Sequence, residues 1–166
     1  MVDPRLLAQQ AIASLALQAP NIGMAPPPSS ASGLVGLPVW MWVERTAETT
    51  GPVEASASAG GVTVTAEARV SQVVWNMGDG NIVTCGLGTP YVQGTEGESP
   101  DCGHVYGQAS SRHVPGGGPW PITATSTWTI TWSGGGLSGT ETLELSSSAE
   151  LFVGELHVLN QDGASR

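Results

Sequence analysis

Residues 121–133 read PITATSTWTITWS, and this stretch decides the class of fold. Apolar residues and one serine alternate with threonine without exception, so that five threonines share one face of an extended chain. A strict period of two is typical of a β-strand with one buried face and one solvated face. The stretch therefore predicts a long antiparallel strand, whose buried face would carry Ile122, Ala124, Trp128, Ile130 and Trp132.

The same alternation continues on both sides of this strand. Glycine-rich turns are expected at Gly60-Gly61, at 78–80 and at 134–136. Short strands joined by such turns favour an antiparallel immunoglobulin-like β-sandwich. We expect this all-β domain over residues 34–160, with an extra C-terminal hairpin and a flexible tail over 161–166. The other predicted strands are 39–43, 53–59, 62–69, 72–77, 81–85, 140–146 and about 150–159.

The N-terminal segment, residues 1–19, has the pattern of an amphipathic helix with leucine, alanine and isoleucine at helical spacing. Asp3 is a suitable N-cap, and Pro4 suits the first helical position. Residues 20–33, with three consecutive prolines from Pro26, predict a linker. A short helix of this kind must dock on something. Packing on its own domain is the plainer interpretation, and docking on a second copy or on another protein also remains open, because the linker lets the helix reach away from the sandwich.

Three segments match, in order, the elements of a known family. Residues 75–80 read WNMGDG, residues 104–106 read HVY, and residues 119–125 read PWPITAT. They resemble the W-D-F-G-D-G, H-x-Y and Y-x-V-x-L-x-V elements of PKD domains. These domains are immunoglobulin-like sandwiches of extracellular proteins, and they occur in secreted actinobacterial proteins. The resemblance covers roughly residues 50–133, and it implies a PKD-like sandwich.

The resemblance also implies structural roles for the motif residues. Trp75 would fill the core, and the two motif glycines would permit a tight turn around Asp79. Tyr106 would lie at a corner of the sandwich with its hydroxyl bonded to backbone. The chain departs from the family at Asn76 and Met77, where the family has Asp and Phe. The full motif set is Trp75, Gly78, Asp79, Gly80, His104 and Tyr106.

The two cysteines, Cys85 and Cys102, flank a loop rich in Gly, Pro and Ser (86–101). Their spacing fits no zinc pattern, and no second metal-binding pair accompanies them. A disulfide is therefore preferred over a pair of reactive thiols. It indicates an extracellular or cell-surface location, although the chain shows no signal peptide.

Composition excludes several classes of partner. The chain has a formal net charge of −9 and a pI near 4.5, and it contains no lysine. Nucleic acid is not an expected partner, because phosphate binding depends on Lys and Arg. No stretch is long and apolar enough to predict a membrane span. The absence of lysine also excludes a Walker A nucleotide site, and we expect no cofactor.

Candidate catalytic and metal-binding residues are weakly patterned. The histidines, His104, His113 and His157, form no evident constellation, and no G-x-S-x-G motif occurs. The acidic residues of the cysteine loop are Glu96, Glu98 and Asp101, with Asp79 in a nearby turn. Flexible loop acids do not suit a glycosidase, and no D-x-D-x-D-G motif marks a calcium site. We therefore expect that the protein is not an enzyme and that it has no metal site with a recognisable motif. The sequence does not decide whether the acidic loop binds calcium.

Tryptophans that the pattern does not assign to the core are the remaining candidates for a binding site. Trp40, Trp42 and Trp120 are candidates for a binding surface, because they do not belong to the threonine-rich strand's apolar face. The leading hypothesis is an extracellular structural or protein-interaction module with an unidentified protein partner. The alternative is a carbohydrate- or cell-wall-binding module, for which the three tryptophans would have to form an exposed coplanar platform.

Overall fold

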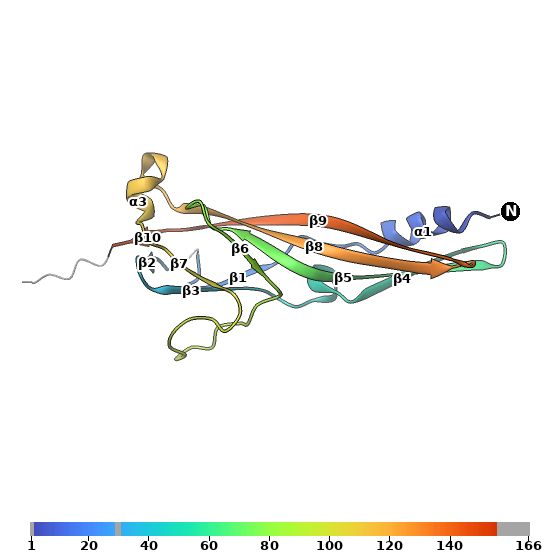
Figure 1. Cartoon of the computed structure of the whole chain (residues 1–166), viewed down its shortest axis with the longest axis horizontal. Helices are drawn as coiled ribbons and strands as arrows, with labels where there is room; N and C mark the ends of the chain where they lie inside the picture. The colour runs from blue at the N-terminus through green and yellow to red at the C-terminus, as the bar shows by residue number, and fades with distance from the viewer. Residues whose placement is uncertain (1, 29–30, 156–166) are drawn as a thin grey trace, which may run out of the picture.

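The computed structural model describes residues 2–28 and 31–155 and shows an elongated, mostly β molecule (Figure 1). One long sheet runs the length of the molecule. A smaller sheet and helix α3 (Ser110–His113) lie at one end, and helix α1 (Pro4–Ala13) lies at the other. In these described ranges, no helix has the length and apolar character needed to cross a membrane.

The long sheet is antiparallel, in the order β4 (Val53–Ala59), β5 (Val62–Asn76), β8 (Trp120–Gly134) and β9 (Leu137–Leu151), with β6 (Ile82–Cys85) also paired to β5. The predicted strand over 121–133 is β8, at the centre of this sheet. The predicted strands over 62–69 and 72–77 are one strand, β5, with a register shift between Val70 and Gln72. The C-terminal hairpin is confirmed, and its strand β9 is much longer than the predicted 140–146.

The smaller sheet consists of β1 (Ile22–Ala25), β3 (Pro38–Val43) and β7 (Gly103–Val105), paired antiparallel in that order. A parallel pair of two-residue strands, β2 (Gly33–Leu34) and β10 (Val153–Gly154), lies beside it. Two short helices, α2 (Ala47–Thr50) and α3, and a 3-10 turn, η1 (Pro115–Gly117), complete the fold.

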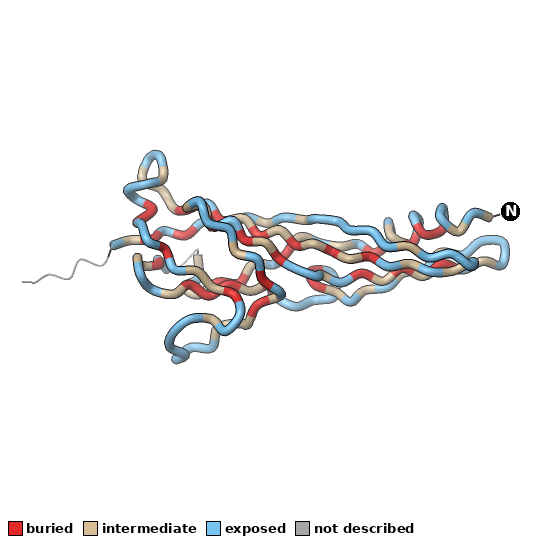
Figure 2. The backbone as a smooth tube through the Cα atoms, viewed as in Figure 1, coloured by how far each residue is buried: buried red, intermediate tan, exposed pale blue. Residues whose placement is uncertain are grey.

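A core between the two sheets occupies the end of the molecule that carries the smaller sheet. Alternate residues of β3, Val39, Met41 and Val43, point inward and contact alternate residues of β5 and β8, including Trp75 and Ile122. Apolar side chains on one face of each sheet lose contact with water in this way, which stabilises the layered arrangement. Figure 2 shows buried positions recurring along the central strands, while the hairpin tips and the cysteine loop are exposed.

Helix α1 packs on the same face of the long sheet, at the opposite end. Leu7, Ala8 and Ala11 are buried, and they contact residues such as Val64 and Trp128 together with strand β4. The helix thus docks on its own domain, which was one of the alternatives that the sequence left open.

Two expectations about the N-terminal region need correction. The helix ends at Ala13 instead of residue 19, because Ser14 caps it and its hydroxyl donates to the carbonyl of Ala11. The segment 20–33 is not a linker throughout, since β1 lies in it and forms an edge of the smaller sheet. The last predicted strand, 150–159, is replaced as far as residue 155 by the end of β9 and by β10, and the tail over 161–166 lies outside the described residues.

Candidate functional site

The motif residues are brought together at the turn after β5. Trp75 is fully buried in the core, and Gly78 has a φ of +84°. A Cβ at Gly78 would lie 2.3 Å from the carbonyl oxygen of Pro121, so that only glycine fits this turn. The carboxylate of Asp79 accepts hydrogen bonds from the backbone and the side chain of Asn81, each at 3.1 Å. Gly80 also has a positive φ.

His104 and Tyr106 reach this turn from the chain around β7. The Nε2 atom of His104 lies 2.8 Å from the Asp79 carboxylate, and the Tyr106 hydroxyl donates to the carbonyl oxygen of Met77 at 2.8 Å. Burial, and secondarily the negative charge of Asp79, raise the pKa of Tyr106, so its hydroxyl stays protonated and acts as a donor. All these polar atoms form hydrogen bonds within the protein, so the arrangement stabilises the turn and its contact with the chain around β7.

The remaining candidate catalytic residues do not converge. His113 stacks on Trp120 and bonds to the carbonyl of Ala109, and His157 lies outside the described residues. Glu96, Glu98 and Asp101 are exposed, and Asp101 bonds only to neighbouring loop hydroxyls. Over residues 2–28 and 31–155, no three His, Cys, Asp or Glu side chains lie close enough together to hold a metal ion.

The three candidate binding tryptophans do not form one platform. Trp120 is buried in the core, with its ring stacked on Tyr106 at 5.8 Å between centroids. Trp40 and Trp42 both project from the outer face of β3, opposite the core residues. The structure therefore brings two of the three together and separates the third.

Trp40 and Trp42 line a groove of about 780 Å³ on the outer face of the smaller sheet. Its walls come from distant parts of the chain: the segment from β1 to Pro27, the start of β3, and the cysteine loop. Most of the lining side chains are apolar or aromatic, which is usual for a site that takes a ligand. The principal lining residues are Met24, Pro26, Leu37, Trp40, Trp42, Tyr91, Gln93 and Thr95.

The polar atoms of the aromatic residues in the groove are already bonded within the protein. The indole N–H of Trp40 donates to the carbonyl oxygen of Gly97 at 2.9 Å, and that of Trp42 donates to Glu44 at 2.7 Å. The Tyr91 hydroxyl donates to the carbonyl oxygen of Thr95 at 2.9 Å. These residues consequently offer a ligand their ring faces and edges more than their hydrogen-bonding atoms.

Close packing holds both tryptophans in place. The Trp42 ring lies over Gly23 of β1, where an added Cβ would be 2.1 Å from the indole nitrogen. Trp40 packs edge-on against Tyr91, with centroids 5.2 Å apart, and is only 6% exposed. The groove thus has a preformed floor, with Trp42 as its more accessible ring.

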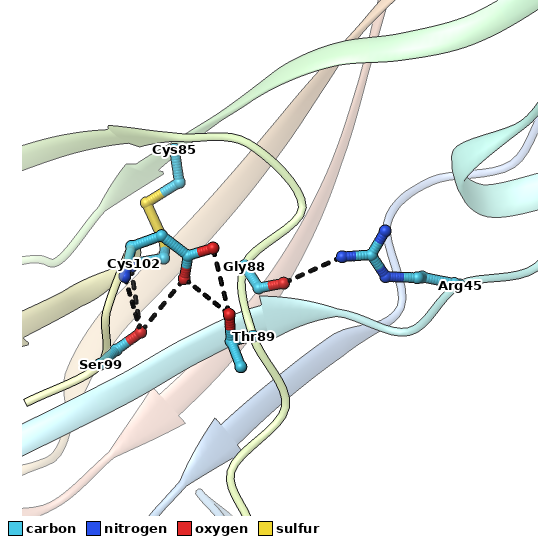
Figure 3. The surroundings of a disulfide bond; sticks show 7 residues. Arg45, Cys85, Gly88, Thr89, Ser99 and Cys102 are labelled. Atoms are coloured by element: carbon cyan, nitrogen blue, oxygen red, sulfur yellow. Dashed lines mark hydrogen bonds between the residues drawn. A yellow bond between two sulfur atoms is a disulfide. The ribbon is translucent and has the colours of Figure 1, made fainter.

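The disulfide fixes the loop that forms one wall of the groove. Cys85 and Cys102 are bonded, with Cα atoms 5.6 Å apart, which confirms the predicted pairing and indicates an oxidising environment. The Thr89 hydroxyl donates to Asp101, and Arg45 donates to the carbonyl oxygen of Gly88 at 3.1 Å (Figure 3). The loop that carries Tyr91 is therefore anchored at both ends.

Sequence reasoning missed most of the groove. Tyr91 lies in the cysteine loop and Pro26 lies in the segment expected to be a linker, so neither was a candidate. The cysteine spacing was the one signal that pointed to an ordered loop. Comparisons with protein-family models, with curated proteins and with solved structures find no match to this chain.

Proposed function

We propose that this chain is a non-catalytic protein-interaction module of the extracellular space or cell surface. In this proposal, the groove beside Trp42 holds an apolar, extended segment of a partner protein. The aromatic rings and the neighbouring Leu37, which is 49% exposed, would supply the contact area. Tryptophan is among the residues that dominate binding energy at protein interfaces.

The proposal rests on one observation: the polar atoms of the aromatic side chains in the groove already form hydrogen bonds within the protein. A sugar presents hydroxyl groups that need hydrogen-bonding partners as well as a ring to stack on. In the groove, the N–H groups of Trp40 and Trp42 and the Tyr91 hydroxyl donate to protein acceptors instead. Apolar side chains of a peptide need no such partners, so the groove suits them better.

A carbohydrate-binding function remains the second candidate. It is favoured by the half-buried ring of Trp42 and by the exposed polar residues Gln93 and Thr95 at the same groove. The separation of Trp120 from the other two tryptophans counts against the flat platform that this alternative would use.

The PKD-like assignment and the location outside the cytoplasm belong to the same proposal. The contacts from Asp79 to His104 and from Tyr106 to Met77 support the assignment, because they join the two halves of the motif. The disulfide supports an oxidising compartment. The chain's negative charge, −9, fits a soluble surface with no affinity for nucleic acid.

The test is a selection of binders from a displayed random-peptide library on the wild-type protein with its disulfide intact. We expect apolar or proline-rich peptides, and calorimetry should show that Trp42→Ala weakens the binding of a selected peptide by about tenfold or more. Leu37→Ala should act in the same direction. Ile82→Ala is the matched control, since Ile82 is 65% exposed and does not line the groove.

A panel of soluble oligosaccharides forms the second arm of the test. If an oligosaccharide binds in a manner that depends on Trp42 and no selected peptide does, the carbohydrate-binding alternative replaces the proposal. Peptide binding that Trp42→Ala and Leu37→Ala leave intact would place the site elsewhere on the molecule. The melting temperature of each variant shows whether the fold is retained.

A further inference from the structure

Strand β9 forms one edge of the long sheet. It pairs with β8 along all of its 15 residues, and no strand pairs with its other side in the part of the chain that the structure describes. An edge strand presents a row of free backbone N–H and C=O groups, and this row can pair with another strand. With 15 residues, β9 is a long edge strand, since strands in globular proteins usually have about five or six residues.

Several of the usual protections of an edge are missing from β9, although it carries three glutamates, of which Glu141 pairs with Ile130 and so lies on the inner face. It contains no Pro, Lys or Arg, and its pairing with β8 has no register shift that would twist it away. Its charged residues are Glu141, Glu144 and Glu150. The opposite edge, β4, is only seven residues long, and helix α1 packs against it.

Apolar side chains gather on the inner face beside this edge. Leu143 is 42% exposed, Leu137 is 36% exposed, and Leu145 is half-buried. The Trp132 ring reaches over Gly139, where an added Cβ would be 2.6 Å from the indole nitrogen. The side chains of an additional strand would pack beside these residues and reduce their exposure to water, as neighbouring strands do elsewhere in the sheet.

We propose that the β9 edge pairs antiparallel with the β9 edge of a second copy, about a two-fold axis at Leu143. In this register, Leu143 faces the same residue of the second copy. A residue that lies n positions before Leu143 in one copy then faces the residue n positions after Leu143 in the other copy. Directly opposed residues lie on the same face of a sheet, so the inner faces of the two copies are continuous. The two long sheets become one continuous sheet.

This register keeps the glutamates of β9 from facing each other directly, and it leaves the two Glu144 residues as diagonal neighbours. Glu141 faces Leu145 of the second copy, and Glu144 faces Thr142, so no glutamate lies directly opposite another. A two-fold axis one residue further along, at Glu144, would place two glutamates face to face, which destabilises a pair of strands. The two copies carry a net charge of −9 each, so added salt should strengthen the pairing by screening their repulsion.

The pairing leaves the groove available. The groove lies on the smaller sheet, and none of its lining residues belongs to β9. A dimer would therefore present two grooves, and a partner with two suitable segments would be held more tightly than by one copy. The proposal stands whatever ligand the groove takes.

Sedimentation equilibrium of the disulfide-intact full chain at low and high salt tests the pairing. We expect a monomer–dimer equilibrium that salt shifts toward dimer. Leu143→Glu should be monomeric over the same concentrations, because two glutamates would face each other at the axis, next to Glu141. Ile82→Glu, an exposed position on β6, is the matched control and should dimerise like the wild type. A wild type that stays monomeric throughout, or a Leu143→Glu variant that still dimerises, overturns the proposal.

Cysteine cross-linking tests the register separately. Under mild oxidation, Leu143→Cys should form a disulfide-linked dimer, because the two cysteines would be direct cross-strand neighbours. Leu137→Cys should not, because residue 137 would face residue 149 of the second copy. Efficient cross-linking through residue 137 and none through residue 143 would show a different interface.

Discussion

Asp79 joins its own turn to a strand that follows 25 residues later in the chain. Its side chain is 7% exposed, and that of His104 is 11% exposed. Burial opposes ionisation of the carboxyl group, but the hydrogen bonds from His104 and Asn81 outweigh it and hold the pKa of Asp79 below its usual value. The ionised form is therefore the one that stabilises the turn.

Acid should weaken this stabilisation. A carboxylate whose pKa is lowered by folding contributes stability above its unfolded pKa, about 3.9, and loses it as the pH falls through the lower folded value. Asp79→Asn should lower the free energy of unfolding at pH 6, and its difference from the wild type should shrink as the pH falls below about 4. Urea titrations at several pH values measure this, with the exposed Glu96→Gln as control. A difference that does not change with pH would show that the charge is unimportant.

Trp75 is the residue whose loss should cost most. It is fully buried between the sheets, next to Met77 and Ile122 in the core. Trp75→Ala should lower the free energy of unfolding by about 3–5 kcal/mol or prevent folding. Chemical denaturation measures the effect. Val92→Ala, in the exposed loop, should change stability by less than about 0.5 kcal/mol.

Helix α1 contributes to stability through one face. Leu7 is 3% exposed against Val64, whereas the adjacent Leu6 is 59% exposed. Leu7→Ala should cost about 2–5 kcal/mol, and Leu6→Ala should cost little, since only the first change leaves a cavity. Thermal denaturation distinguishes the two. If Leu7→Ala and Leu6→Ala lowered stability equally, the helix would not be docked on the sheet. The helix would then be available to bind a second copy or another protein.

The cysteine loop depends on its disulfide. Replacing both Cys85 and Cys102 by Ser should cost about 3 kcal/mol, because the unfolded chain regains the freedom of the closed loop. The contact between Trp40 and Tyr91 should also loosen, which would change tryptophan fluorescence and weaken binding in the groove. Reductant should reproduce these effects in the wild type and have no effect on the double variant. A double variant with unchanged stability would contradict this account.

The whole molecule should unfold as one unit despite its length. Its buried apolar residues form separate clusters at the two ends, but β5 and β8 run through both, and Val70 contacts both. Calorimetry should show a single transition, which Leu7→Ala and Trp75→Ala both lower. Two transitions, each shifted by one variant only, would show that the ends unfold independently.

The sequence by itself determined the features that depend on local patterns. The alternation over 121–133 predicted β8, the glycine-rich segments predicted the hairpin turns, and the cysteine spacing predicted the disulfide. Side-chain alternation and turn chemistry act between near neighbours, so these signals need no knowledge of the rest of the chain.

Only the tertiary structure decided the partners of segments with no strong local pattern. Residues 22–25 are too short and too close to prolines to predict a strand, and β1 exists because β3 offers an edge to which it can bond. The groove arises from this pairing and from the tethered loop, which bring Pro26, Trp42 and Tyr91 together. The docking of α1 likewise depends on an apolar face that β4, β5 and β8 form only once they are paired. Such contacts join residues that are distant in the sequence, so no local pattern encodes them.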